Sequence, residues 1–414
     1  MRLFGLTALA ALAACRFGFD PRVQSDAAVT PEPDAATDAT PPLPPDAPPV
    51  LSCAPARFTV DSGTAYLTAV GTPRGFDVFT VDSALVVHGY AFKFVGDRLE
   101  LVAGTGGALP VPSSIGPVAA VALDPDTGDT AEVAIAVPYP MTARNLAMDA
   151  AVGTVVVPLD AQLQPAAPVA SATMNDGLIV GPGALAGGDH GRIAYLAKDS
   201  DGFLAMQAVS RRGVVTAGTL PVNTNAHTVT RQTLVRAASG YLGVWSDNSS
   251  APHEAIIAAP IDDNLVARAP VTISVDDFHG SFVPGAAYLP TAHRYLFGWM
   301  VKTDHDFLHL SMRDDQLANA PGEIDLLGAE GTVPIIAAGD TDFLAVWPDT
   351  STSPTLLRAA RVDAAGKPTF INPMNTLHEF VAFDVIAHHN QTVLFWVDKN
   401  GTGPNLWIDP LCSP

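Results

Sequence analysis

Four tryptophan residues recur at nearly equal intervals through the second half of this 414-residue chain. They are Trp245, Trp299, Trp347 and Trp396, separated by 54, 48 and 49 residues. Each ends an apolar or aromatic run, and each is followed by a short segment rich in Asp, Asn, Gly, Ser and Pro and then by a second apolar run. Apolar runs bounded by such turn residues predict β-strands. The chain is therefore expected to repeat a unit that contains two strands joined by a turn.

A repeat of about 50 residues has room for two further strands, which is the size of a four-stranded β-propeller blade. A fainter copy places Leu196 at the tryptophan position, 49 residues before Trp245. Two more copies are expected at residues 76–100 and 118–140, with Leu123 at the tryptophan position, although Leu123 and Leu196 are 73 residues apart. The predicted fold is all-β: a single propeller of about seven four-stranded blades, with six or eight as alternatives.

The repeats are similar to bacterial β-propeller repeats of the general form fLvvWxD...ixaarvdadG. This resemblance extends from about residue 190 to residue 414. The copy around Trp347 matches most fully, at Phe343, Leu344, Val346, Trp347, Asp349, Ala359, Arg361, Val362, Asp363 and Gly366. A tryptophan at one fixed position in each repeat predicts packing in the blade core rather than a platform for sugars.

The N-terminal segment has the layout of a secretory signal peptide. Arg2 supplies the positive charge, residues 3–12 are apolar, and the run is too short to span a bilayer. Residues 12–15, Leu-Ala-Ala-Cys, resemble the lipobox of bacterial lipoproteins. The resemblance implies that residues 1–14 are removed and that Cys15 becomes the first, acylated residue of the mature chain. An ordinary signal peptide cleaved nearby is the alternative.

Residues 15–52 predict a linker between a membrane anchor and a folded domain at residues 53–414. The linker is rich in Pro, Ala, Asp and Thr and has almost no core-forming residues, so we expect a disordered, extended stalk. A tail with no mechanical role would have the same composition. Arg16 follows the lipobox cysteine in place of Asp, which by resemblance to lipoprotein sorting implies the outer membrane of the cell envelope rather than the inner one.

Cys53 and Cys412 stand at the two ends of the predicted domain. In an oxidising compartment such a pair predicts a disulfide, with two free thiols as the alternative. A propeller must join its last blade to its first, and its terminal strands commonly share a blade. A bridge between Cys53 and Cys412 would then lock this junction.

Charge and motifs narrow the range of functions. The chain has 42 Asp and Glu against 22 Lys and Arg, a net charge of -20, which disfavours nucleic acid and anionic headgroups as partners. It lacks the G-x-S-x-G, H-E-x-x-H, P-loop and C-x-x-C motifs. The segment Asp124–Thr130, DPDTGDT, resembles a calcium loop, but its place in the repeat favours a turn.

Neither histidines nor paired carboxylates form a local ligand cluster in the sequence. We therefore expect no metal and no cofactor, and interpret these residues as polar strand or turn positions. The candidates are His305 and His309, His388 and His389, Asp262 and Asp263, Asp276 and Asp277, and Asp314 and Asp315.

Two classes of function remain. The favoured one is a monomeric, membrane-anchored, non-catalytic module that binds a protein or a glycan. The alternative is a glycan-active propeller hydrolase or lyase with a carboxylate or histidine site near the central channel.

Replacing Cys15 with Ala should abolish membrane attachment, because the acyl chains that anchor the mature chain would have no sulfur to carry them. Membrane fractionation of cells that produce the parent and the variant measures this. If both chains sediment equally with membranes, the lipoprotein interpretation is wrong.

Overall fold

The chain divides into two compact units, Met1–Ala47 and Pro48–Pro414. The computed structural model describes part of the second unit. Predictions for residues 1–52, including the signal peptide, Cys15 and the stalk, lie outside the described residues. The described residues are 54–60, 63–114, 116–123, 130–140, 152–166, 184–187, 192–198, 204–212, 214, 220–221, 229–247, 254–276, 284–301, 307–327, 334–349, 355–371, 380–388, 391–398 and 405–411.

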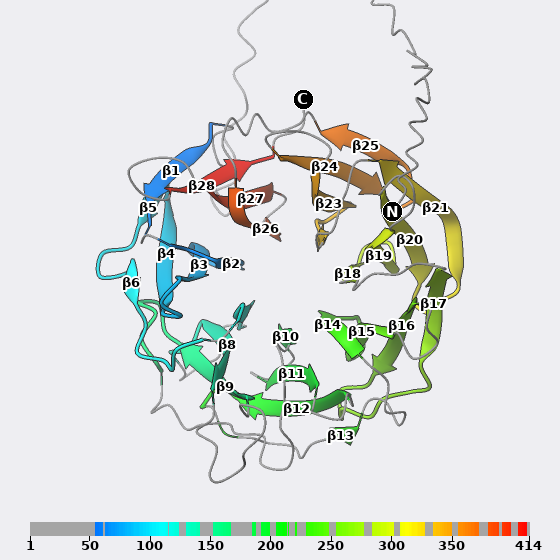
Figure 1. Cartoon of the computed structure of the whole chain (residues 1–414), viewed down its shortest axis with the longest axis horizontal. Coiled ribbons are helices and arrows are strands. Elements are labelled where there is room, and N and C mark those ends of the chain that lie inside the picture. The colour runs from blue at the N-terminus through cyan, green and yellow to red at the C-terminus, as the bar shows by residue number, and fades with distance from the viewer. Residues whose placement is uncertain are drawn as a thin grey trace, which may run out of the picture. The chain divides into compact units, whose positions relative to one another are not determined.

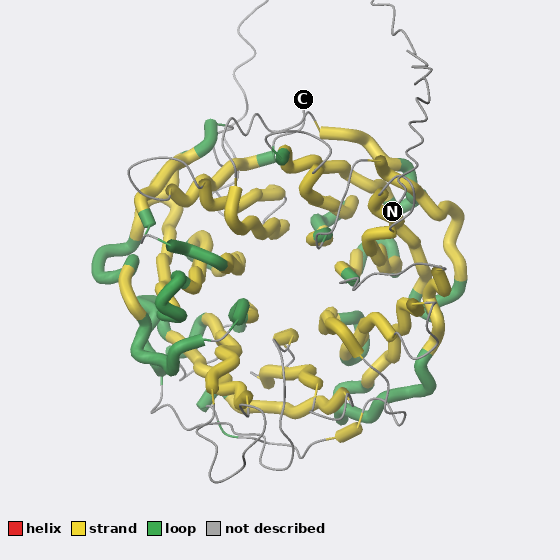
Figure 2. Tube along the Cα trace, in the orientation of Figure 1, coloured by secondary structure: helices red, strands yellow, loops and turns green. Residues whose placement is uncertain are grey.

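Every regular element among the described residues is a β-strand (Figures 1 and 2), and the strands form seven antiparallel sheets, named blades 1 to 7 in chain order. Blade 1 contains β2 (Tyr66–Thr72), β3 (Gly75–Val81), β4 (Val87–Val95), β5 (Arg98–Leu101) and β6 (Gly107–Ala108). Blade 2 contains β7 (Ala119–Ala122), β8 (Val133–Pro140) and β9 (Val152–Leu159). Blade 3 contains β10 (Ala184–Gly187), β11 (Arg192–Lys198), β12 (Leu204–Ser210) and β13 (Leu220–Pro221).

The remaining four blades each contain four strands. Blade 4 contains β14 (Val229–Arg236), β15 (Tyr241–Asp247), β16 (Glu254–Ile261) and β17 (Val271–Asp276), and blade 5 contains β18 (Gly285–Leu289), β19 (Arg294–Val301), β20 (Phe307–Asp314) and β21 (Asn319–Leu327). Blade 6 contains β22 (Ile335–Ala338), β23 (Asp342–Asp349), β24 (Leu356–Asp363) and β25 (Pro368–Ile371). Blade 7 contains β26 (Phe380–His388), β27 (Gln391–Asp398), β28 (Asn405–Pro410) and β1 (Ala56–Thr59).

The first strand of each blade is its innermost strand, and these seven strands contact one another in a closed series. β2 contacts β7, and the series continues through β10, β14, β18, β22 and β26, which returns to β2. The sheets radiate from this inner ring in Figure 1. The predicted all-β propeller with seven blades is confirmed.

Blade 7 combines both ends of the folded unit. The C-terminal strands β26, β27 and β28 are completed by β1, which pairs antiparallel with β28 from Ala56 opposite Ile408 to Thr59 opposite Asn405. The N-terminal strand is therefore the outermost strand of the last blade, as the ring-closure argument predicts.

The side chains of each strand alternate between the two faces of its sheet, and this explains how one blade packs against both of its neighbours. In β15, Tyr241 and Trp245 join a buried cluster with residues of blade 3 such as Leu196, whereas Leu242 and Val244 join residues of blade 5. Successive strand side chains point to opposite faces, so one strand contributes to two interfaces. Leu196 and Trp245 are each the fifth residue of the second strands β11 and β15, as predicted.

The four periodic tryptophans lie on the second strands and are buried. Trp245, Trp299 and Trp347 are each 1% exposed, and Trp396 is 5% exposed. Trp245 packs in a cluster shared with blade 3, and Trp396 packs in one shared with blade 6. In both cases the indole faces the preceding blade, which stabilises the interface between blades by removing a large apolar surface from water.

Three innermost strands, β7, β10 and β18, consist largely of small residues, which allows neighbouring blades to approach closely near the ring axis. β7 reads Ala-Ala-Val-Ala, β10 reads Ala-Leu-Ala-Gly, and β18 begins Gly-Ala-Ala. A Cβ atom on Gly285 would lie 2.7 Å from the carbonyl oxygen of Pro334 in the next blade. Glycine is therefore required at this close approach.

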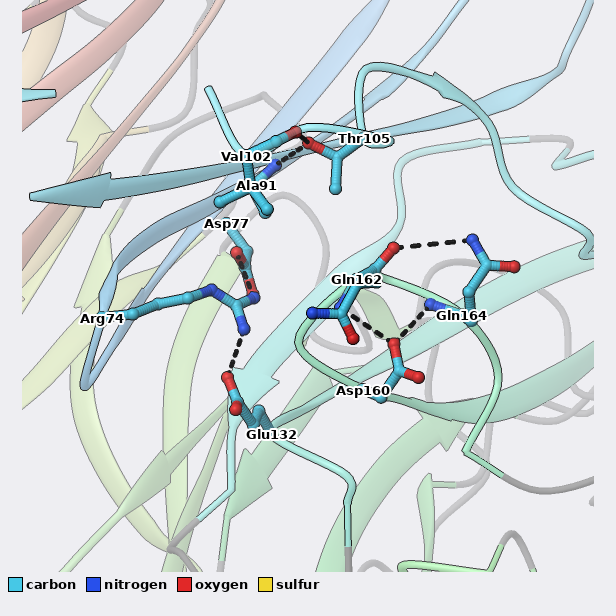
Figure 3. A network of polar contacts seen from close by, with 9 residues as sticks. All are labelled: Arg74, Asp77, Ala91, Val102, Thr105, Glu132, Asp160, Gln162 and Gln164. Atoms are coloured by element: carbon cyan, nitrogen blue, oxygen red, sulfur yellow. Dashed lines mark hydrogen bonds and ion pairs between the residues drawn. The ribbon is translucent and has the colours of Figure 1, made fainter. Parts of the chain in front are cut away.

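An aspartate turn recurs in five blades. Its Oδ1 atom accepts the backbone N–H groups of the second and fourth following residues at 2.8–2.9 Å (Asp160 in Figure 3). The third following residue has a positive φ of 59–84°. The turns begin at Asp82, Asp160, Asp262, Asp314 and Asp363, with Leu85, Leu163, Leu265, Leu317 and Gly366 at positive φ. Asp262 and Asp314 thus lie in turns, as predicted.

The prediction for Leu123 was wrong by one strand. Leu123 follows β7, the innermost strand of blade 2, and the second strand of that blade is β8. The segment 124–129 therefore connects the first and second strands, not the second and third as the repeat alignment assumed. This longer connection shifts the upstream register. Residues 124–129 themselves lie outside the described residues.

Replacing Trp347 with Ala should lower the free energy of unfolding by about 3–5 kcal/mol, because it leaves a cavity between two blades. Calorimetric or denaturant unfolding measures the loss. The matched control is Phe370→Ala in the same blade, since Phe370 is 63% exposed and its removal should change stability little. Equal effects from the two substitutions would contradict the packing assignment.

Candidate functional site

A row of three aromatic rings and one guanidinium crosses blade 7. Phe383 on β26 is opposite Trp396 on β27, Trp396 is opposite Trp407 on β28, and Trp407 is opposite Arg57 on β1. The two indoles are stacked, with ring centroids 5.2 Å apart and an angle of 6° between their planes. The Arg57 guanidinium carbon lies 5.4 Å from the Trp407 ring centroid, within cation–π range. We call these four residues the closing-blade row.

Hydrogen bonds fix the outer end of this row. The Trp407 Nε1–H group donates to Asp398 Oδ2 at 3.1 Å, and Asp398 Oδ1 accepts the backbone N–H of Asn405 at 2.9 Å. Asp398 is buried, Trp407 is half-buried and Arg57 is exposed. Trp407 packs against the buried cluster between blades 6 and 7, and part of its ring stays exposed beside the exposed Arg57. An oriented aromatic edge next to a guanidinium can contact a ligand and donate hydrogen bonds to it.

The fold does not require tryptophan at position 407. The third-strand residues opposite the periodic tryptophans of blades 4, 5 and 6 are Ile257, His309 and Arg358. Of blades 4 to 7, only blade 7 has a second tryptophan opposite the periodic one. The sequence itself distinguishes this residue. Of the five tryptophans, Trp407 is the one that does not follow the 50-residue period, because it lies 11 residues after Trp396.

The candidate histidines do not come together among the described residues. His309 lies on β20 with its ring 4.6 Å from that of Trp299, and His388 ends β26. His305 and His389 lie outside the described residues. Within the described part of the chain, no three His, Cys, Asp or Glu side chains are grouped so that they could hold a metal ion.

Arg74 of blade 1 forms ion pairs with the buried Asp77 of the same blade and with the partly exposed Glu132 next to β8 of blade 2 (Figure 3). The Arg74 guanidinium donates to both carboxylate oxygens of Asp77 at 2.9 Å and also contacts Glu132. Burial raises the pKa of Asp77 to about 6, although the charge of Arg74 and its hydrogen bond act in the opposite direction. Because its acceptors are occupied by Arg74, this carboxylate serves the interface between blades.

Asp384 occupies the innermost strand of blade 7 and links it to blade 1. Its Oδ2 atom accepts the backbone N–H of Ala69 at 2.8 Å and the Thr68 hydroxyl at 3.2 Å, and Oδ1 accepts the N–H of Val385 at 2.8 Å. Burial raises the pKa of Asp384 to about 6, while these hydrogen bonds lower it. Sequence patterns gave no sign of this contact, which joins residues 315 positions apart.

A third polar cluster lies in blade 5. His293 Nδ1 is 3.0 Å from Asp315 Oδ2 and 3.4 Å from the hydroxyl of Tyr288. Burial and the nearby Asp315 raise the pKa of Tyr288 to about 12. A raised pKa disfavours the phenolate, so Tyr288 is poorly suited to act as a base. These clusters belong to blades 5, 7 and 1, and the described contacts do not bring them together.

Several predicted positions lie outside the described residues, among them Cys15, Cys53, Cys412, Asp277 and the segment Asp124–Asp129. Asp276 ends β17. None of the described residues belongs to a helix long and apolar enough to cross a lipid bilayer.

Comparison with known proteins shows the fold alone. Neither a protein-family model nor a curated protein matches the sequence. Among solved structures, the BP39L lectin from Burkholderia pseudomallei matches with a TM-score of 0.55 at 16% identity, over 84% of this chain and 96% of the lectin. The polysaccharide lyase Uly1 and a PL25 ulvan lyase each match with a TM-score of 0.52, at 9% and 8% identity, over 84% and 85% of this chain and 90% and 95% of theirs.

Stability should fall as pH rises from about 4 to about 7. Asp77, Asp384 and Asp409 have pKa values raised from 3.8 to about 6, so the folded state binds more protons than the unfolded state in this range. The stabilising contribution is complete below pH 4 and is lost as these groups ionise. Melting temperatures measured across this range test the direction.

The Asp384→Asn variant provides the control, because an amide does not ionise. Its melting temperature should depend less steeply on pH than that of the parent. An unchanged slope would mean that Asp384 does not titrate with a raised pKa.

Proposed function

We propose that this propeller is a non-catalytic binding module that uses the closing-blade row to hold a glycan. The row carries the proposal because it is the described cluster that offers a ligand a fixed aromatic ring together with donor groups. Trp407 is oriented by Trp396 and Asp398, and Arg57 is exposed beside it. A preformed aromatic surface with a few oriented polar groups suits a ligand that has both C–H and hydroxyl faces.

The other polar clusters support binding over catalysis. Asp77 is paired with Arg74, and Asp384 accepts three hydrogen bonds from its surroundings. Glycoside hydrolysis canonically uses two carboxyl groups, one on either side of the scissile bond. The described contacts instead engage these carboxylates in interfaces between blades.

The structural neighbours are compatible with a glycan ligand. One is named a lectin and two are named polysaccharide lyases, so a ring of this kind accommodates carbohydrate recognition in other proteins. At identities of 16% or below they support the fold, and the choice of ligand rests on the chemistry of the row. A protein ligand that offers an aromatic or acidic side chain is the alternative occupant.

A glycan-active enzyme is the second candidate function, and Asp384 would be its candidate catalytic group. This carboxyl lies on an innermost strand and has a pKa of about 6, which is suitable for proton transfer near neutral pH. Loss of polysaccharide cleavage in Asp384→Asn, with binding retained, would support the enzyme over the binding module.

We further propose that the module is displayed from a membrane. The support for this step is the N-terminal sequence, in which a lipobox-like segment ending at Cys15 precedes the proline-rich residues 16–52. The net charge of -20 would keep the domain from adhering to anionic headgroups. Such a module would hold its ligand away from the lipid surface.

Replacing Trp407 with Ala should weaken glycan binding by about tenfold or more, because a central aromatic anchor is lost. The probes are soluble polygalacturonate, alginate, dextran and laminarin, measured by affinity electrophoresis and by tryptophan fluorescence. The control is Phe370→Ala, which removes an exposed aromatic ring from another blade. If the parent binds one of these probes and Trp407→Ala binds it equally well, the row is not the site.

A further inference from the structure

We propose that the Asp409 carboxylate is a second ligand-binding group beside the closing-blade row, and that it selects a neutral, hydroxyl-rich glycan over an acidic one. This role rests on the proposed function, because it concerns a ligand held at the row. Asp409 lies on β28, two residues after Trp407. It would add a hydrogen-bond acceptor to the aromatic edge and the guanidinium already described.

Asp409 and Trp407 lie on the same face of blade 7. Successive side chains of a strand point to opposite faces, so residues 407, 409 and 411 share one face of the chain here. The packing agrees, because Trp407 and Leu411 belong to the buried cluster between blades 6 and 7. Leu406 and Ile408 instead belong to the cluster between blades 7 and 1. The Asp409 side chain is therefore directed towards blade 6, beside Trp407.

The closing strand leaves Asp409 partly exposed. β1 pairs with β28 from Asn405 to Ile408, so Trp407 has Arg57 opposite it and Asp409 has no residue of β1 opposite it. On its other side, Asp409 is opposite Leu394 of β27, which is fully buried. The carboxylate is half-buried as a result, with an apolar neighbour towards the ring axis and no paired strand on the outer side.

The fold supplies no donor to the Asp409 carboxylate. No described residue forms a hydrogen bond or an ion pair with it, and burial, the one cause acting on it, raises its pKa from 3.8 to about 6. By contrast, Asp384 of the same blade accepts three hydrogen bonds. A partly desolvated carboxylate without a donor is unfavourable, and a ligand that supplies a donor removes that penalty.

The guanidinium groups on the adjoining elements are engaged elsewhere. Arg361 of blade 6 donates to Asp342 at 3.0 Å and to the carbonyl oxygen of Leu411 at 2.8 Å. Arg57 lies over the Trp407 ring. Asp409 therefore remains available to accept a hydrogen bond from a ligand.

The chemistry of the two groups specifies the class of ligand. A molecule that contacts Trp407 and Asp409 together must offer C–H groups to the indole and a hydroxyl donor to the carboxylate. The two Cα atoms are about 6.8 Å apart along the strand, a distance that one sugar residue can bridge. An acidic glycan would bring its own carboxylates towards Asp409, and the net charge of -20 adds to this repulsion. Neutral glycans meet both requirements.

Binding to neutral and acidic polymers tests this role. The parent should bind dextran or laminarin more tightly than alginate or polygalacturonate in affinity electrophoresis. Asp409→Asn should weaken binding of the neutral polymer by about tenfold, because the sugar hydroxyl loses a charged acceptor. The control is Asp97→Asn, which removes an exposed carboxylate from blade 1 and should leave binding unchanged.

The outcomes distinguish this role from the proposed function. Equal binding of the neutral polymer by Asp409→Asn and the parent, with a loss in Trp407→Ala, would overturn the role of Asp409 and leave the row as the site. A parent that prefers alginate or polygalacturonate would overturn the selectivity. If Trp407→Ala binds as well as the parent, or the parent binds none of the four polymers, the proposed function fails and the role of Asp409 fails with it.

The pH dependence of binding separates direct contact from a structural effect. Because the ionised carboxylate is the better acceptor, affinity of the parent for the neutral polymer should fall several-fold from pH 7.5 to pH 5, and Asp409→Asn should lose this dependence. The same pH dependence in both chains would overturn the contact. The other charged groups on the elements packed against this face are common to both chains: Arg57, Asp342, Arg361, Asp363 and Asp398.

Thermal unfolding supplies the second readout. At pH 7.5 Asp409→Asn should melt at or above the temperature of the parent, because an amide carries no partly desolvated charge. A lower melting temperature together with the loss of binding would assign Asp409 to the structure of blade 7 and overturn its role in binding.

Discussion

The pairing of β1 with β28 is the interaction on which the ring depends. Six blades are built from consecutive strands, whereas blade 7 takes its outermost strand from the opposite end of the domain. Two further contacts join blade 7 to blade 1: Phe76 packs edge-on against Phe395, with centroids 5.4 Å apart, and Asp384 accepts the N–H of Ala69. Because loop closure over such a separation costs chain entropy, these contacts must form together for the ring to be stable.

Ring closure and the closing-blade row share residues. Arg57 belongs to the closing strand, and Trp407 belongs to the strand that receives it. A ligand that contacts both would bind the closed ring in preference to an open one, and so would stabilise the closed ring in proportion to its affinity. Binding at this row would therefore be coupled to folding, which a site within one blade in the middle of the chain would not offer.

The aspartate turns show how local strain is offset by packing. A leucine at positive φ costs about 1–2 kcal/mol relative to an ordinary backbone conformation. Leu163, Leu265 and Leu317 are nevertheless 1–5% exposed, and burial of a leucine side chain contributes about 1.5–3 kcal/mol. In blade 6 the same position is Gly366, which adopts the conformation without strain and adds no side chain to the core.

The blades could be predicted from the sequence, because a blade is made of neighbouring strands whose alternation of side chains, turns and 50-residue period are local. It placed Leu196 at the position equivalent to the four periodic tryptophans, but it misplaced Leu123, where a longer connection shifts the repeat. The hydrogen bond between Asp384 and Ala69 and the stacking of Arg57 on Trp407 could not be predicted in this way. These partners are more than 300 residues apart and follow no period. Their contact exists because the ring closes, and closure is a property of all seven blades together.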